Sequence, residues 1–287
     1  MAEPEGTVAL VTGASRGAGR GIAHALGERR ATVYVTGRST LAAPNPDRPG
    51  TIEDTADEVI ARGGTGIPLR VDHTHPAEVA ALIERIASEN GRLDLLVANA
   101  WMGYEIEVKR IPFWKAPLEH WDLMFGSLRA QMLTAQLAAP LMLEQTRGLI
   151  VNTLWDVGSH FHGHVFYDTV KNAVSRMSFG MSEQLRDHGI AVVALSPGWM
   201  LTEVMDLTPE QAAQTETPEY VGRAVAALAE DPDVIRWSGR TLRVVDVARE
   251  YGFTDVDGTV LSPFWERYLA RAGAPPRSSG RRLGDDN

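Results

Sequence analysis

Short apolar runs alternate with longer amphipathic segments along most of the chain. Seven runs are predicted to be β-strands: "TVALVT" (7–12), "ATVYVT" (31–36), "GIPLRV" (66–71), "DLLVA" (94–98), "GLIVNTL" (148–154), "IAVVALS" (190–196) and "TLRVV" (241–245). Most are continuously apolar, which is typical of strands covered on both faces. Six segments are predicted to be helices: 18–30, 51–62, 76–90, 118–145, 165–188 and 217–230. This alternation predicts an α/β fold of parallel βαβ units with right-handed crossovers.

Two stretches lack this pattern. Residues 38–50 ("RSTLAAPNPDRPG") combine proline with small and polar residues and are predicted to form a loop. Residues 273–287 ("GAPPRSSGRRLGDDN") are rich in glycine, proline and polar residues and are predicted to be disordered. Because no linker or internal repeat interrupts the alternation, residues 1–272 are predicted to form a single domain.

The composition excludes several classes of protein. The chain of 287 residues is 44% apolar and 23% charged, as in ordinary globular proteins. Its net charge of -9 argues against non-specific binding to nucleic acid, which requires a basic surface. The absence of cysteine excludes disulfides and thiolate metal sites, and no apolar run approaches the ~20 residues of a membrane span. Because the N-terminus also lacks the basic region of a signal peptide, we expect a soluble, cytoplasmic protein without nucleic-acid or membrane partners.

The first predicted strand runs directly into the glycine-rich stretch "TGASRGAGRGIA" and then into a helix. Glycines at such a turn let the backbone approach a pyrophosphate, whose charge is met by the helix N-terminus. An ordinary glycine-rich turn is the alternative, but the position after the first strand favours a dinucleotide site. The residues expected at the cofactor are Gly13, Ser15, Arg16, Gly17, Ala18 and Gly19.

The end of the second predicted strand indicates which dinucleotide binds. An acidic residue there binds a free ribose hydroxyl, whereas arginine accommodates a 2′-phosphate. This strand ends in "VTGRS", with Arg38 and no acid, and Arg16 supplies a second cation on the same side. If these are not merely solvated surface arginines, they favour NADP(H) over NAD. Asp72, which closes the third strand, is placed to bind the adenine amino group or, alternatively, to cap the helix that begins near Pro76.

Tyr167 and Lys171 are four residues apart near the start of the 165–188 segment. On a helix this spacing places both side chains on one face. A neighbouring ammonium favours the phenolate, so the tyrosine becomes a usable acid for a carbonyl or base for an alcohol. By itself the pair is a weak motif, because chance matches are frequent.

Together with the glycine loop, this pair makes the chain resemble the short-chain dehydrogenase/reductase family over roughly residues 5–250. The matching pieces are "TGASRGAG" (12–19), "VANA" (97–100), Tyr167-x-x-x-Lys171, and "SPG" (196–198) followed by Thr202. The stretch "SGRTLRVVDVAREYGFTDVDG" (238–258) is similar to the branch typified by mammalian dehydrogenase/reductase member 1.

The resemblance implies a three-layer αβα Rossmann fold with a seven-stranded parallel sheet, and hydride transfer involving a nicotinamide. It implies that Lys171 binds the nicotinamide ribose and that Tyr167 is the acid or base. It also implies that Asn99 lies near the cofactor and that Pro197, Gly198 and Thr202 hold its nicotinamide end. Family members usually form dimers or tetramers, so the resemblance implies a homodimer or homotetramer, assembled here through 118–145 and 165–188.

The chain departs from the family pattern around a serine expected 12 or 13 residues before the tyrosine. Counting back gives Trp155 or Leu154, and of these only Trp155 offers a donor, its indole N–H. Neighbours with suitable groups are Thr153, Asp156 and Ser159, of which Ser159 is predicted to be the replacement. Losing one preorganised donor typically costs ~10²–10³ in rate.

Two further positions depart from the family. Ser127 or Leu128 stands near the position of an asparagine in the family's proton relay, and Trp101 replaces a glycine that normally follows the Asn-Ala pair. Three interpretations remain. The chain is a reductase in which Tyr167 and Lys171 act with a substitute for the serine, a Rossmann enzyme for another step such as imine or alkene reduction or an elimination, or a non-catalytic cofactor-binding protein.

Three tryptophans follow three successive predicted strands: Trp101, Trp155 and Trp199. They fall at the carboxyl ends of the strands, where open α/β sheets bind ligands. Unless they are core or subunit-interface residues, they predict an apolar, aromatic small-molecule substrate.

Three histidines alternate along the segment before Tyr167: His160, His162 and His164. No carboxylate pattern accompanies them, so we predict no metal site, and we interpret the segment as a substrate-lining or solvated loop. His162 is the predicted substrate contact, and either it or His164 is a candidate for proton transfer near neutral pH.

Overall fold

The computed structural model describes residues 6–103, 111–156, 161 and 163–262. They contain seven parallel strands in one sheet: β1 (Val8–Thr12), β2 (Thr32–Gly37), β3 (Thr65–Arg70), β4 (Leu95–Ala98), β5 (Gly148–Thr153), β6 (Ile190–Ser196) and β7 (Thr241–Arg243). The strand order is β3-β2-β1-β4-β5-β6-β7. The order reverses direction between β1 and β4, and such a switch point opens a crevice at the carboxyl ends of the strands.

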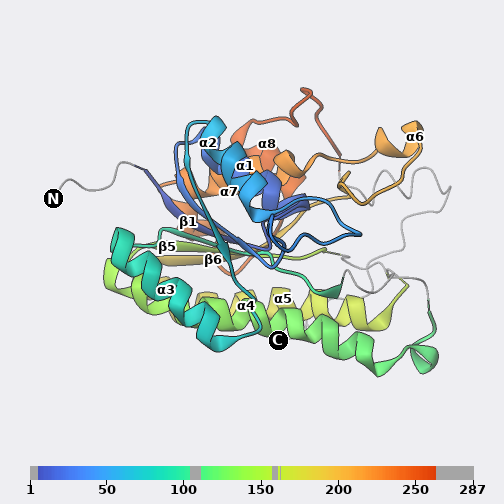
Figure 1. Ribbon diagram of the computed structural model, residues 1–287, viewed down its shortest axis with the longest axis horizontal. Helices are drawn as coiled ribbons and strands as arrows, with labels where there is room; N and C mark the ends of the chain where they lie inside the picture. The colour runs from blue at the N-terminus through green and yellow to red at the C-terminus, as the bar shows by residue number, and fades with distance from the viewer. Residues whose placement is uncertain (1–5, 104–110, 157–160, 162, 263–287) are drawn as a thin grey trace, which may run out of the picture.

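Helices cover both faces of the sheet. They are α1 (Gly17–Glu28), α2 (Ile52–Ala61), α3 (Pro76–Asn90), α4 (Leu118–Gln145), α5 (Val165–Leu185), α6 (Pro209–Ala212), α7 (Pro218–Glu230) and α8 (Val244–Tyr251). Helices α3, α4 and α5 lie on one face, and α1, α2, α7 and α8 lie on the other (Figure 1). The predicted three-layer αβα Rossmann fold with a seven-stranded parallel sheet is therefore confirmed.

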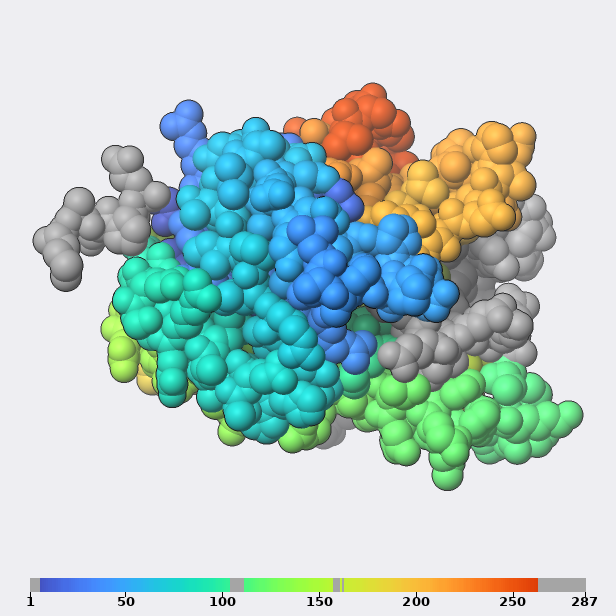
Figure 2. Space-filling view, viewed as in Figure 1, coloured from blue at the N-terminus to red at the C-terminus, as the bar shows by residue number. Residues whose placement is uncertain are grey.

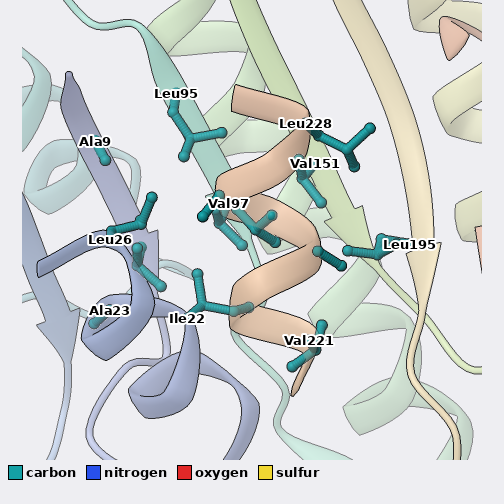
Figure 3. Packing of buried hydrophobic residues seen from close by; sticks show 14 of the residues in the cluster. Ala9, Ile22, Ala23, Leu26, Leu95, Val97, Val151, Leu195, Val221 and Leu228 are labelled. Atoms are coloured by element: carbon teal, nitrogen blue, oxygen red, sulfur yellow. The ribbon is translucent and has the colours of Figure 1, made fainter. Parts of the chain in front are cut away.

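The largest core cluster lies between the sheet and the helices α1 and α7. Ile22 and Leu26 of α1 and Val221 of α7 belong to one buried cluster with the strand residues Val97 and Val151 (Figure 3). The central strands β1, β4, β5 and β6 are buried along their whole lengths, which explains their continuously apolar sequences.

Six predicted strands agree with the structure to within one residue at each end, and the predicted helices 76–90 and 118–145 agree at both ends. The seventh predicted strand is wrong at its end, because β7 stops at Arg243 and α8 begins at Val244. Val244, Val245 and Val247 are buried on one side of this helix. A run of valines suggested a strand, but here these residues have the spacing of an amphipathic helix.

The start of α4 and the segment that carries α6 project on the same side of the molecule (Figure 2). The predicted loop 38–50 contains no helix or strand, since β2 ends at Gly37. The predicted tail 273–287 lies outside the described residues. Within the described ranges, no helix has the length and apolar character needed to cross a bilayer.

Candidate functional site

The glycine loop after β1 is packed too closely for side chains. Gly13 has φ +64°, and a Cβ there would lie 2.8 Å from Ala100 Cα. A Cβ on Gly19 would overlap the Gly13 carbonyl oxygen and lie 2.7 Å from Asn99 Nδ2. Glycine is therefore required at both positions, one for its backbone conformation and one for the close approach of α1 to the loop.

Beside this loop lies a cleft of about 470 Å³. It is bordered by residues that follow β1, β2, β3 and β4. Of the residues predicted to bind the cofactor, it brings together Gly13, Ser15, Arg16, Ala18, Arg38, Asp72 and Asn99. Trp101 and Met102 also line it, whereas Tyr167 and Lys171 are not among its lining residues. The lining of the cleft thus does not include Tyr167 and Lys171, the two residues predicted to be catalytic.

The two arginines predicted to meet a 2′-phosphate have different surroundings. The Arg16 guanidinium donates hydrogen bonds to the backbone carbonyls of Arg48, Pro49 and Gly50, and to Ser39 Oγ. These bonds hold the 39–50 loop against the glycine loop, a role that the sequence did not indicate. The Arg38 side chain is half exposed, with Nη1 3.9 Å from Asp72 Oδ2. Arg38 is therefore the more accessible cation at the cleft.

Asp72 makes a local turn instead of capping the next helix. Its Oδ1 accepts hydrogen bonds from the backbone N (3.0 Å) and Oγ1 (2.7 Å) of Thr74. The N-cap of α3 is His75, so the helix-cap alternative for Asp72 is wrong. Burial raises the pKa of Asp72, but the Thr74 hydrogen bonds and the Arg38 charge outweigh it and hold the pKa below its ordinary value.

A carboxylate lies at the N-terminus of α1. Arg16, the N-cap residue, makes no side-chain cap, and Gly17 N donates to Glu203 Oε2 at 3.0 Å and Oε1 at 3.2 Å. Thr202 adjoins the same point, since its Cγ2 lies 3.6 Å from where a Gly17 Cβ would be. The segment after β6 therefore reaches the phosphate end of the cleft, and it brings an anion there. Glu203 was not predicted from the sequence, although it follows a residue that was.

Asn99 fastens the glycine loop to β4. Its backbone N donates to Thr12 Oγ1 at 2.8 Å, and its Nδ2 donates to the carbonyls of Thr12 and Gly13. Thr153 Oγ1 in turn donates to Asn99 Oδ1 at 3.2 Å. The side chain of Asn99 therefore links β1, β4 and β5 at the edge of the cleft.

The turn after β6 is held by a buried acid. Gly198 N donates to Glu216 Oε1 at 2.6 Å, and Glu216 N donates to the Trp199 carbonyl at 2.8 Å. Pro197 and Gly198, predicted to hold the nicotinamide end, are thus part of a fixed turn. The sequence did not single out Glu216, which lies 18 residues further along the chain.

Tyr167 and Lys171 lie in the first turns of α5, and both are buried, with relative exposures of 8% and 9%. Lys171 Nζ is 5.3 Å from the centroid of the Tyr167 ring, so the two side chains are neighbours as the spacing predicts. Burial lowers the pKa of Lys171 to about 7. Its amine therefore changes charge near neutral pH.

Two of the three predicted tryptophans meet Tyr167. The Trp101 and Trp155 rings approach it edge-on, with centroids 5.9 Å and 6.2 Å away. Lys171 Nζ lies 3.7 Å from the centroid of the Trp101 ring. Trp199 is instead in the turn after β6 and is not a member of the apolar cluster that the described residues form around Tyr167.

The histidine segment is described only in part. Ser159, His160 and His162 lie outside the described residues. His164 is the N-cap of α5, where its Nδ1 accepts a hydrogen bond from Tyr167 N at 3.4 Å, and its ring stacks on His120. Burial and the neighbouring His120 lower the pKa of His164. No group of three His, Cys, Asp or Glu side chains suited to a metal occurs in the part of the chain that is described.

Comparison with known proteins places this geometry in a family. The family model for short chain dehydrogenases matches residues 7–213. The chain belongs to the short-chain dehydrogenase family. Members of the family are oxidoreductases that use nicotinamide cofactors, and this is the reaction class of the chain.

Relatives within the family cover nearly the whole chain. The chain is 35% identical to dehydrogenase/reductase SDR family member 1 of Mus musculus and of Homo sapiens, over 92% of this chain and 88% of each relative. A crystal structure of a short-chain type dehydrogenase/reductase from Mycobacterium marinum has a TM-score of 0.70 and 27% identity, and covers 83% of this chain and 93% of that one. A crystal structure of a protein assigned as an NAD(P)-dependent gluconate 5-dehydrogenase from Beutenbergia cavernae, with NADP bound at low occupancy, has a TM-score of 0.69 and 26% identity, over 84% of this chain and 96% of that one. The predicted resemblance to the member 1 branch is confirmed.

Proposed function

We propose that the protein is an NADPH-dependent reductase that transfers hydride to a carbonyl group of an apolar, aromatic small molecule, or catalyses the reverse oxidation. The observation that carries this proposal is the contact between Tyr167 and Lys171 in a buried aromatic site, directly beyond a nucleotide-sized cleft. Trp101 and Trp155 supply the flat apolar walls that such a substrate requires.

The cleft suits a dinucleotide with a 2′-phosphate. Its glycine loop leaves no room for a Cβ at Gly13 or Gly19, and Arg38 presents a half-exposed guanidinium beside it. The neighbour with bound NADP supports the same cofactor. The residues that would hold it are Gly13, Ser15, Arg16, Gly17, Ala18, Gly19, Arg38, Asp72, Asn99, Tyr167, Lys171, Pro197, Gly198 and Thr202. The nicotinamide supplies the hydride when it is bound.

In this proposal Tyr167 delivers the proton. Its hydroxyl gives a proton to the substrate oxygen during reduction, and the Lys171 ammonium beside it favours the resulting phenolate. His164, as the N-cap of α5, fixes the turn from which the Tyr167 side chain projects. Ser159 and His162 remain predicted contributors to the substrate site.

One observation favours a second candidate function. Trp155 stands at the position of the family's serine and offers only an indole N–H, and the nearby Thr153 hydroxyl donates to Asn99. A substrate that needs no hydroxyl donor, such as an imine or an activated alkene, fits this arrangement. A non-catalytic NADP-binding protein is the third interpretation.

Cofactor binding and turnover separate these interpretations. Calorimetry is expected to show tighter binding of NADPH than of NADH, and absence of binding by either would remove the oxidoreductase proposal. A panel of ketones, quinones and imines then tests turnover by loss of NADPH absorbance. With any substrate found, Tyr167→Phe is expected to reduce the rate by about 10²–10⁴. Undiminished turnover would rule out Tyr167 as the acid, whereas NADPH binding without turnover of any compound would favour the non-catalytic protein.

We also propose a homodimer or homotetramer formed through α4 and α5, working in the cytoplasm as a single domain over residues 1–272. Exposed apolar side chains on these helices, Met132 and Phe179, support such an interface. Sedimentation of the protein tests it, since a monomer at micromolar concentration would contradict the proposal.

A further inference from the structure

The buried ammonium of Lys171 lies against a ring that the family pattern does not contain. Trp101 occupies a position where the family normally has glycine, and Lys171 Nζ lies 3.7 Å from its ring centroid. Tyr167 provides a second, more distant ring, with its centroid at 5.3 Å. Ring faces attract cations, and the attraction is strongest for tryptophan and for contacts removed from water.

The position of the indole is set by its own segment. A Cβ on Gly103 would lie 2.7 Å from Trp101 Nε1, so the absence of a side chain at Gly103 leaves room for the ring. Between them, Met102 N donates to the buried Ser127 Oγ at 2.9 Å, which ties the segment to α4. The ring therefore rests on Gly103 and is anchored through Ser127, independently of Lys171.

Among the described residues, the apolar cluster that surrounds the ammonium contains no charged side chain. The apolar cluster around Tyr167 includes Met124 and Leu128 from α4 and Trp155 from the segment after β5. On α5 itself, Tyr167 is a titratable residue whose ring centroid lies 5.3 Å from Lys171 Nζ. Burial is the cause that lowers the pKa of Lys171, and no charged side chain in the described part of the chain contributes. Of the described groups around the ammonium, the indole face is thus the one whose contact favours the charged form.

We propose that Trp101 is a positioning residue for Lys171, whose ammonium is held charged and in place beside Tyr167 by a cation–π contact with the indole. Trp101 also lines the cofactor cleft, so the same residue borders that cleft and contacts the lysine. This role rests on the proposed function only in its last step, in which the ammonium acts on Tyr167. The contact itself exists without cofactor or substrate, and can be measured without either.

The chain is well suited to a direct measurement, because it contains only three lysines: Lys109, Lys115 and Lys171. Protein labelled with [ε-¹³C]lysine gives three Cε–Hε signals, and the variants Lys109→Arg and Lys115→Arg assign the other two. The Lys171 signal is expected to be shifted upfield by the indole ring current and to titrate near pH 7. In Trp101→Leu the upfield shift is expected to disappear and the titration midpoint to fall by about one pH unit. Trp101→Phe, which keeps a ring face, is expected to retain part of both effects.

Trp114→Leu is the matched control, since Trp114 is 71% exposed and packs edge-on against Phe113 instead of Lys171. It is expected to leave the Lys171 signal unchanged. A wild-type signal without an upfield shift, or an unchanged midpoint in a folded Trp101→Leu, would overturn the proposal. If Trp101→Leu does not fold, the upfield shift of the wild-type Lys171 signal and the titration midpoint of Trp101→Phe test the proposal instead. Since no cofactor is present, failure of NADPH binding or turnover would remove the proposed function and leave this result intact.

Discussion

At the cofactor cleft the imidazole of His73 is buried between two hydroxyls, whereas at the chemical end the ammonium of Lys171 is buried against two aromatic rings. The ring nitrogens of His73 lie 2.8 Å from Thr36 Oγ1 and 2.9 Å from Thr134 Oγ1. Lys171 Nζ lies over the rings of Trp101 and Tyr167. Burial lowers the pKa of both bases, to about 4 for His73 and about 7 for Lys171.

The two partners stabilise different charge states. Each hydroxyl is also within hydrogen-bond distance of a backbone carbonyl, Val11 O at 3.1 Å and Ala130 O at 2.9 Å, so a neutral imidazole keeps its donor and its acceptor paired when one hydroxyl turns its single proton to the ring and the other accepts. A ring face attracts the cation and offers little to the neutral amine. The buried base at the cleft is therefore kept neutral, while the surroundings of the buried base at the chemical end favour its charged form.

The largest effect is expected from the neutral histidine. The pKa of His73 is about 4 in the folded protein and 6.5 in its ordinary state. As pH falls from 6.5 to 4, His73 therefore binds a proton in the unfolded chain but stays neutral in the folded protein. The free energy of unfolding falls as a result. The loss from this one group is about 3 kcal/mol at full extent, and it is absent above pH 6.5.

Urea unfolding between pH 4.5 and 7.5 measures this loss. His73→Gln, which keeps polar atoms but does not titrate, is expected to lower stability at neutral pH and to flatten the pH dependence. His75→Gln is the control, because His75 is two residues away and its side chain is 63% exposed. Parallel pH curves for His73→Gln and wild type would show that His73 is not kept neutral by the fold.

A smaller loss of stability is expected from Gly19→Ala. The new Cβ would meet backbone atoms of Gly13 and Ala14, which cannot move aside as a flexible side chain does. Overpacking of this kind costs about 2 kcal/mol, and the displaced glycine loop is expected to bind NADPH more weakly. Thermal unfolding and calorimetry measure the two effects.

Gly180→Ala is the matched control for this change. Gly180 lies on the exposed side of α5 with nothing within 4 Å of its Cβ position. Alanine there is expected to stabilise the helix by about 0.5–1 kcal/mol. If Gly19→Ala behaved like Gly180→Ala, the close approach of α1 to the glycine loop would not be needed.

The glycine loop beside the cofactor cleft was largely predictable from the sequence, for a physical reason. Its glycines act through backbone geometry next to a strand, and both the strand and the following helix have clear apolar patterns. Gly13 and Gly19 therefore lie where the sequence predicts. Arg16 is the exception, because its charge could be inferred but its bonds to the carbonyls of residues 48–50 could not. Those carbonyls belong to a loop whose path no periodic pattern indicates.

The chemical end was predictable only in part. The spacing of Tyr167 and Lys171 is a property of one helix, so their contact follows from the sequence. The contact between Lys171 and Trp101 joins residues 70 positions apart and depends on how the segment 101–103 folds against α4. The three tryptophans at strand ends looked equivalent in the sequence, yet the cluster around Tyr167 includes Trp101 and Trp155 but not Trp199.

Arg38→Asp tests whether the charge of Arg38 lets the cleft distinguish NADPH from NADH. Arg38 is accessible at the end of β2, so losing its cation is expected to weaken NADPH binding about tenfold, which equals about 1.4 kcal/mol. NADH, which lacks the 2′-phosphate, is expected to bind no worse than to wild type. Arg29→Asp is the control, with side-chain exposure of 55% against 51% for Arg38. Equal losses for NADPH and NADH would mean that Arg38 acts on the structure of the cleft and not on the phosphate.

The smallest effect is expected at Glu203, an anion on the cofactor side that faces the N-terminus of α1. Its carboxylate accepts the hydrogen bond of Gly17 N, where a bound pyrophosphate would meet a like charge. Glu203→Gln keeps an oxygen that can accept this bond and removes only the charge. NADPH is therefore expected to bind about threefold more tightly, a gain of about 0.6 kcal/mol, measured by calorimetry at low salt.

Asp206→Asn is the control for Glu203→Gln, since it removes one negative charge from an exposed position in the same segment. It is expected to leave NADPH affinity unchanged. The gain at Glu203 is also expected to shrink at high salt, because screening weakens repulsion between partly exposed charges. Weaker NADPH binding by Glu203→Gln would reverse the interpretation. The carboxylate would then support the start of α1, and the cofactor side, like the chemical end, would depend on a charge held in place.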